Sequence, residues 1–351
     1  LKEKATPHER LYIEAQAAYL GDEPKDIKER RKQLIDAIEN IIHEHPDDIE
    51  AKAFLAVRLW QFNRRGIPIA SHQAVDALLD QIFTANPMHP AHHYRIHLWD
   101  RSDGAKRVVD TAVAAGPAWP SIAHNWHMGG HIFAYLGRHY DAAWQQEASA
   151  RVDHAHMARY WILPDEIHNF AHNNEWLTRS LRHQGRVTES VELAKNMIEL
   201  PRHPQYNTID KGRNSSVYGR QRLIETLTAF EQWETLRELG GTMYLEPHVK
   251  DAEGALRAYA MGRAAGHLGD LDALAASIGE LEAMIAELKV ERAEAVDEAE
   301  EEALAADKNG EDVRKAMADA LKSFDGRLGT LRRNVASLEA LGDLARGEDE
   351  K

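Results

Sequence analysis

The sequence predicts an all-α fold. Helical periodicity of apolar residues runs through nearly all of its 351 residues, and the apolar–polar alternation that is typical of β-strands is almost absent. Proline, glycine or aspartate residues interrupt this periodicity at short intervals and leave elements of roughly 12–18 residues. Elements of this length, joined by short polar turns, indicate a series of helix pairs.

The composition is that of a folded protein and excludes several classes of function. The net charge of -14 argues against a nucleic-acid partner, which would need a basic face. The chain has no cysteine, which excludes disulfides, thiolate metal ligands and cysteine nucleophiles. No apolar run is long enough to predict a membrane span. The first residue is Leu1 rather than methionine; we expect an excised chain, with an extracytoplasmic location slightly favoured and the compartment otherwise unknown.

Three turns between predicted helices share the same chemistry. They are residues 136–143 (LGRHYDAA), 184–194 (QGRVTESVELA) and 268–276 (LGDLDALAA). In each, a glycine follows the end of one helix, where a positive φ is common, and small residues near the start of the next helix allow close packing. The pattern is carried by Leu136, Gly137, Tyr140, Ala143, Gly185, Ala194, Leu268, Gly269 and Ala275.

These turns resemble those of the tetratricopeptide repeat (TPR) family over about residues 7–284. The spacing departs from that family, because Gly137 and Gly185 are 48 positions apart and the usual repeat has about 34 residues. The resemblance implies a right-handed α-solenoid of divergent repeats, whose first helices line a concave groove. It is specific for the fold and implies no particular reaction.

The C-terminal part has a different pattern. Residues 271–306 predict one long helix, residues 308–312 a turn, and the residues up to about 345 a second long helix. Apolar residues recur at steps of three and four, which predicts an antiparallel helical hairpin with coiled-coil character; they are Leu281, Ile285, Leu288, Leu321, Phe324, Leu328, Leu331, Val335 and Leu338. We therefore divide the chain into a repeat domain (residues 1–270) and a hairpin (residues 271–346). Residues 337–351 resemble the first helix of another repeat, which predicts further domains of the same polypeptide.

Histidine is unusually frequent, and most of the 20 histidines lie between His89 and His172. Three successive first helices of the predicted repeats each carry a stripe of polar residues at i, i+3 or i+4, and i+7, which places each stripe on one helical face. The stripes are His93, His97 and Asp100; His124, His127 and His131; and Asp165, His168 and His172.

Two imidazoles one helical turn apart can bind the same cation. Neighbouring helices lie about 8–10 Å apart, so these side chains can converge on one ion or two. Without thiolates, imidazole and carboxylate ligands favour zinc, copper or iron over calcium or magnesium. Asp100, Asp165 and Glu166 would orient imidazoles or move protons. The histidines could instead be hydrogen-bonded core residues or peptide-binding residues, and two of them could hold a haem.

Two further features accompany the histidines. Gly129 and Gly130 interrupt the middle stripe, which indicates close packing, a kink or room for a ligand. Residues 204–222 form a long polar segment before a helix that Asn214 or Ser215 would cap. Its side chains could contact a substrate carboxylate or phosphate, and the alternative is an ordinary capped inter-repeat loop. The side chains are Tyr206, Lys211, Arg213, Tyr218 and Arg220.

No serine-nucleophile motif, phosphate-binding loop, dinucleotide fingerprint or HExxH motif is present in the chain. The sequence therefore predicts a metal-binding, TPR-like protein that takes a small molecule or peptide in its groove. A catalytic metal would make it an oxidoreductase or a hydrolase. The alternative is a metal-free TPR scaffold that binds a peptide or a partner protein.

Overall fold

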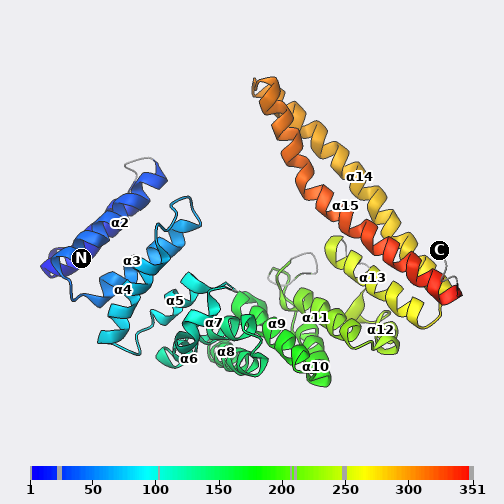
Figure 1. Ribbon diagram of the computed structural model, residues 1–351, viewed down its shortest axis with the longest axis horizontal. Helices are drawn as coiled ribbons and strands as arrows, with labels where there is room; N and C mark the ends of the chain where they lie inside the picture. Colours follow the sequence, from blue (N-terminus) through cyan, green and yellow to red (C-terminus); the bar gives the residue numbers. More distant parts are fainter. Residues whose placement is uncertain are drawn as a thin grey trace. The chain divides into compact units, whose positions relative to one another are not determined.

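The chain folds into helices throughout the part that the structure describes. The computed structural model describes residues 2–21, 26–101, 103–205, 208, 212–246 and 251–347. Within these ranges every regular element is an α-helix or a short 3-10 helix (Figure 1). The predicted all-α class is confirmed. Among the same residues, no helix has the length and apolar character that a membrane crossing requires.

The helices group into two compact units, Leu1–Ile162 and Leu163–Lys351. The expected boundary at residue 270 lies inside the second unit, at the N-cap of one of its long helices. The division into a repeat domain and a hairpin stays a prediction.

The first unit consists of eight α-helices and two 3-10 helices among its described residues. Most are joined by short turns, and successive helices pack against each other. Acidic or hydroxyl side chains cap several of them; Asp48, for example, accepts hydrogen bonds from the backbone NH groups of Glu50 and Ala51. The elements are η1 (Lys2–Lys4), α1 (Pro7–Leu20), α2 (Ile27–Glu44), α3 (Ile49–Asn63), α4 (His72–Ala85), α5 (His92–Trp99), η2 (Ala105–Val108), α6 (Val109–Ala118), α7 (Ala123–Tyr135) and α8 (His139–Tyr160).

Helices α5 and α7, which carry the first two histidine stripes, pack on the same core. Ile96 of α5 and Ile132 and Phe133 of α7 are almost fully buried, and all three belong to one apolar cluster. Burial of such side chains stabilises the fold by roughly 1.5–3 kcal/mol each. This packing fixes the two helices next to each other.

Gly129 and Gly130 allow α7 to pack closely against its neighbours. A Cβ atom on Gly129 would lie 2.6 Å from the carbonyl oxygen of Ala112 in α6, and one on Gly130 would lie 2.2 Å from the side chain of Gln146 in α8. Helix α7 is continuous through both glycines. Of the three explanations offered by the sequence, close packing is the one that these contacts support.

The second unit begins with η3 (Pro164–Glu166) and continues with seven α-helices among its described residues. The turn glycines expected from the sequence have the predicted backbone conformation, with φ of 70° at Gly137 in the first unit and of 73° and 75° at Gly185 and Gly269 in the second. The remaining elements are α9 (His168–His183), α10 (Val187–Glu199), α11 (Ser215–Ala229), α12 (Trp233–Leu239), η4 (Met243–Leu245), α13 (Asp251–His267), α14 (Leu271–Ala305) and α15 (Gly310–Arg346).

The two long helices α14 and α15 begin and end close to the predicted positions, and they lie side by side (Figure 1). Leu281 and Leu288 of α14 share an apolar cluster with Leu331 and Leu338 of α15. Residues 337–346, which resemble a separate helix in the sequence, are the last turns of α15, and Gly347 ends that helix with a φ of 74°. His154 and His156 lie within α8.

Candidate metal centre

Five histidines of α5 and α7 gather in the first unit. They are His93 and His97 on α5 and His124, His127 and His131 on α7, and we call them the five-histidine cluster. The centroid of the His93 ring lies 4.7 Å from that of His97 and 4.9 Å from that of His124. The His127 ring lies 5.5 Å from His124 and 4.4 Å from His131. The structure thus brings together the first two predicted stripes.

His93, His97 and His124 could hold a metal ion. One ring nitrogen of each lies within 4.8 Å of the others. Two nitrogens at bonding distance from a tetrahedral zinc ion are about 3.3 Å apart, so small side-chain rotations would bring the three imidazoles onto one ion.

His93 is oriented by an amide. Its Nδ1 lies 2.8 Å from Oδ1 of Asn125, and because an amide oxygen only accepts, Nδ1 carries the hydrogen. The lone pair of the neutral ring is then on Nε2. Burial lowers the pKa of His93, although the hydrogen bond to Asn125 acts in the opposite direction. The ring is therefore neutral at ordinary pH, as metal binding requires.

His97 packs flat against an aromatic side chain. Its ring stacks on Trp60 of α3, with centroids 4.1 Å apart. Burial lowers the pKa of His97 to about 2, and nearby positive charge, including that of Arg64, adds to the effect. His97 thus offers a lone pair over the whole ordinary pH range.

His127 and His131 form the other end of the cluster. The fully buried His127 donates from Nδ1 to Oε1 of Gln146 over 2.7 Å, and Gln146 returns a hydrogen bond from Nε2 to the carbonyl oxygen of His127 over 3.2 Å. The Nε2 atoms of His127 and His131 are 2.7 Å apart. Oδ2 of Asp100 lies 3.5 Å from Nδ1 of His131. The predicted role of Asp100 in orienting an imidazole stays a prediction.

The third stripe lies in the second unit and has different partners. The rings of His168 and His172 are 5.4 Å apart. Nη2 of Arg213 donates to Nε2 of His168 over 3.2 Å, and the Arg213 charge contributes, after burial, to the lowered pKa of His168. Nδ1 of His172 lies 3.2 Å from the buried carboxylate of Glu175, which Arg222 also contacts.

Asp165 and Glu166 contact the backbone at helix starts. Oδ1 of Asp165 accepts hydrogen bonds from both the backbone NH and the hydroxyl of Ser215, each over 2.8 Å. The negative charge at the start of α11 is thus supplied by the Asp165 carboxylate. Glu166 accepts a hydrogen bond from the NH of Leu163 over 3.3 Å. A role for either residue in orienting imidazoles or moving protons stays a prediction.

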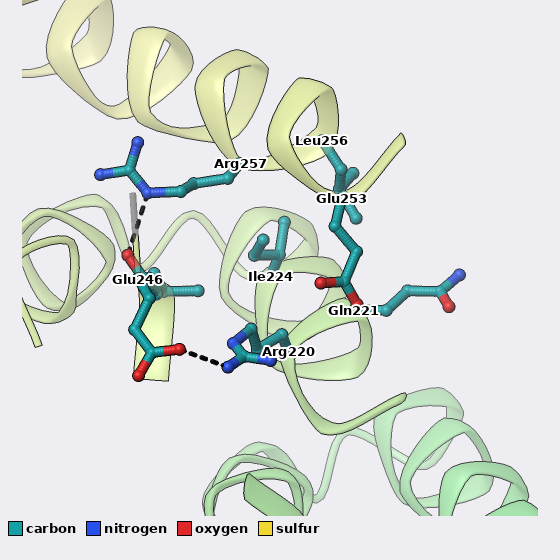
Figure 2. A pocket seen from close by; sticks show the side chains of 8 residues that line it. Arg220, Gln221, Ile224, Glu246, Glu253, Leu256 and Arg257 are labelled. Atoms are coloured by element: carbon teal, nitrogen blue, oxygen red, sulfur yellow. Dashed lines mark hydrogen bonds and ion pairs between the residues drawn. The ribbon is translucent and has the colours of Figure 1, made fainter. Parts of the chain in front are cut away.

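Three of the predicted substrate-binding residues lie in or just before the first turns of α11 and have different partners. Arg220 is buried and donates hydrogen bonds to Ser216 over 2.7 Å and to Glu246 over 2.6 Å. Its side chain borders a cavity of about 10 Å³, which has room for roughly one water molecule. Figure 2 shows this cavity and the carboxylate of Glu253, whose pKa burial raises. Arg213 Nε lies 3.5 Å from the Tyr218 hydroxyl. Tyr206 and Lys211 lie outside the described residues.

Three supporting residues of the cluster are absent from the sequence-based candidates. Asn125 and Gln146 hold the Nδ1 atoms of His93 and His127, and Trp60 packs on His97. Asn125 could have been found, because it directly follows His124. Gln146 and Trp60 come from neighbouring helices, and no spacing within one helix links them to the histidines.

The comparisons with known proteins assign no family to this chain. No protein-family model matches it, and no curated protein matches it either.

Proposed function

We propose that this chain is a metal-binding protein in which His93, His97 and His124 hold one transition-metal ion. The observation that carries the proposal is the proximity of three imidazole nitrogens, all within 4.8 Å of one another, on two packed helices. The lowered pKa values of His93 and His97 support it, because a metal ligand must be unprotonated.

The ligand set restricts the metal. Three neutral imidazoles without a thiolate suit zinc, copper or iron, and they are poor ligands for calcium or magnesium. Three protein ligands leave a coordination position for water or for a small molecule. An ion of this kind polarises a bound substrate or acidifies a bound water, and we include oxidoreductase or hydrolase activity in the proposal.

We also propose that the helix pairs of each unit are divergent TPR-like repeats with the right-handed arrangement of that family. The positive φ of the turn glycines Gly137, Gly185 and Gly269 supports this proposal. For α14 and α15 we propose an antiparallel hairpin. It is supported by the short connection between them and by the shared cluster of leucines.

Elemental analysis tests the metal proposal. The full chain, purified without a nickel column and dialysed, should retain about one or more equivalents of zinc, copper or iron. The double substitution His93→Ala with His97→Ala should remove the ion at this position. The matched control is His154→Ala with His156→Ala, which changes two exposed histidines of the same unit and should leave the metal content unchanged. Less than about 0.2 equivalents of any transition metal in the unsubstituted chain would contradict the proposal.

A metal-free scaffold is the second candidate, and one observation favours it. The hydrogen bonds that His93 donates to Asn125 and that His127 donates to Gln146, together with the one between the Nε2 atoms of His127 and His131, satisfy ring nitrogens without an ion. The same elemental analysis separates the two candidates, because only the metal protein loses an ion when His93 and His97 are replaced.

A further inference from the structure

We propose that His127 and His131 hold a second metal ion next to the first, so that the five-histidine cluster is a dinuclear centre within the first unit. This inference rests on the proposed function, since it places a neighbour beside the ion at His93, His97 and His124.

The pair is already arranged for a shared cation. Gln146 forms two hydrogen bonds with His127, from the amide nitrogen to the backbone carbonyl and from Nδ1 of the ring to the amide oxygen. Together they fix the amide and therefore the tautomer of His127, so that its Nε2 lone pair points at His131. The two Nε2 atoms are 2.7 Å apart. An ion between them requires about 3.3 Å, a change of a few tenths of an ångström per ring.

Asp100 supplies the carboxylate that such a site needs. Its Oδ2 lies 3.5 Å from Nδ1 of His131. A ligand histidine that binds metal through Nε2 carries its hydrogen on Nδ1, and a carboxylate at that nitrogen fixes the ring and makes it a better donor. The other oxygen of Asp100, Oδ1, is buried and has no hydrogen-bond partner among the described residues. Its negative charge also offsets the repulsion between two neighbouring cations.

The two positions are adjacent. His124, a ligand of the first ion, and His127, a ligand of the second, are one turn apart on α7, and their rings stack with centroids 5.5 Å apart. Neighbouring ions in two-metal sites share an oxygen ligand such as hydroxide or a substrate oxygen. The chemical class of the molecule that this centre would take is therefore a small ligand with an oxygen donor.

The third stripe does not offer an equivalent pair. Arg213 donates a hydrogen bond to Nε2 of His168, so a cation there would have to displace a guanidinium. His127 and His131 face a neutral amide and a carboxylate instead.

Copper(II) titration of the metal-free full chain, followed by electron paramagnetic resonance, tests the proposal. We expect two tightly bound equivalents and an integrated spin intensity below the copper content, because neighbouring ions couple. The double substitution His127→Ala with His131→Ala should leave one equivalent with full spin intensity. Replacement of His93 and His97 by alanine should also leave one equivalent, and the His154→Ala, His156→Ala control should leave two.

Because His127 is buried, its loss could unfold the unit, so Asp100→Asn provides a milder variant. It preserves the shape of the side chain and should weaken the second copper about 10–100-fold without weakening the first. Circular dichroism checks that the helices remain.

The outcomes separate this inference from the proposed function. Two coupled ions, one of them lost with His127 and His131, support both. One equivalent that depends on His93 and His97 but is insensitive to Asp100→Asn and to the loss of His127 and His131 overturns the second site alone. No bound copper overturns both.

Discussion

The stacking of His97 on Trp60 makes this tryptophan a reporter of metal binding. The ring centroids are 4.1 Å apart, so a paramagnetic ion on His97 should quench the fluorescence of Trp60 and leave that of most other tryptophans unchanged. We expect copper(II) to lower the fluorescence of the full chain, and Trp60→Phe to remove most of the change. Trp233→Phe, which alters a tryptophan stacked on His267 in the second unit, is the control. Equal quenching in both variants would show that the ion binds elsewhere.

The lowered pKa values of His93 and His97 predict that acid destabilises the metal-free protein. Both rings are neutral in the folded chain, whereas in the unfolded chain they take up protons near their ordinary pKa of 6.5. The contribution of these two groups to the free energy of unfolding should therefore be fully present above pH 6.5. It should decrease as the pH falls below 6.5, and for His97 the decrease should continue until the pH reaches its folded-state pKa of about 2.

Urea unfolding between about pH 7.5 and 5.5, where carboxylates stay ionised, measures this slope. In His97→Gln the slope should be smaller, by up to about 1 kcal/mol per pH unit. An unchanged slope would mean that His97 is not held neutral by the fold.

The histidine periodicity was sufficient to predict that residues of neighbouring helices would meet, because side chains spaced three and four apart share a helical face. The partners of these histidines could not be predicted in this way. Gln146 and Trp60 reach the cluster through the packing of α8 on α7 and of α3 on α5, and which residues face each other across such contacts depends on helix rotation. The contact of Asp165 with Ser215 at the start of α11 also crosses between elements, and no spacing within one helix predicts it.

At the scale of single elements, the glycines of α7 set how closely that helix approaches its neighbours. We expect Gly129→Ala to destabilise the protein by about 1–3 kcal/mol, because the added methyl group would press on the backbone oxygen of Ala112, which cannot move independently of α6. Gly279→Ala is the matched control. This glycine is also inside a helix, has open space at its Cβ position, and should gain up to about 1 kcal/mol from the better helix former. Chemical denaturation of both variants makes the comparison, and equal stabilisation by the two would refute the packing role of Gly129.

Elements with regular periodicity were the easiest to predict. The ends of α14 and α15 agree with the expected ranges because their apolar spacing is unbroken and Asn309 caps the second helix. Helix α5 was harder, since it has eight residues and no side-chain cap. Its position is fixed by the burial of Ile96 and Trp99 in the shared core. This burial depends on tertiary contacts, which the local sequence does not predict.

At the scale of the whole molecule, the division into two units follows from how the apolar faces are shared. One set of buried residues, which includes Ile96 and Phe133, belongs to the first unit, and another, which includes Leu223 and Leu236, belongs to the second. Both units are built from helices with the same apolar spacing. The sequence pattern therefore shows no change between the two units. It changes only where the long helices begin, and for this reason the boundary predicted from the sequence lies at residue 270.

All five histidines of the cluster lie in the first unit, so metal should stabilise the molecule unevenly. An ion that binds only the folded state adds about 2.7 kcal/mol at a free concentration of 100 times its Kd. We expect this to slow amide hydrogen exchange in α5 and α7 and in the helices that share their core. The leucine cluster of α14 and α15 consists entirely of residues of the second unit, and exchange there should change little. Mass spectrometry of peptides with and without metal tests this, and chelator should reverse the protection. Uniform protection of every helix, including α14 and α15, would contradict a centre confined to the first unit.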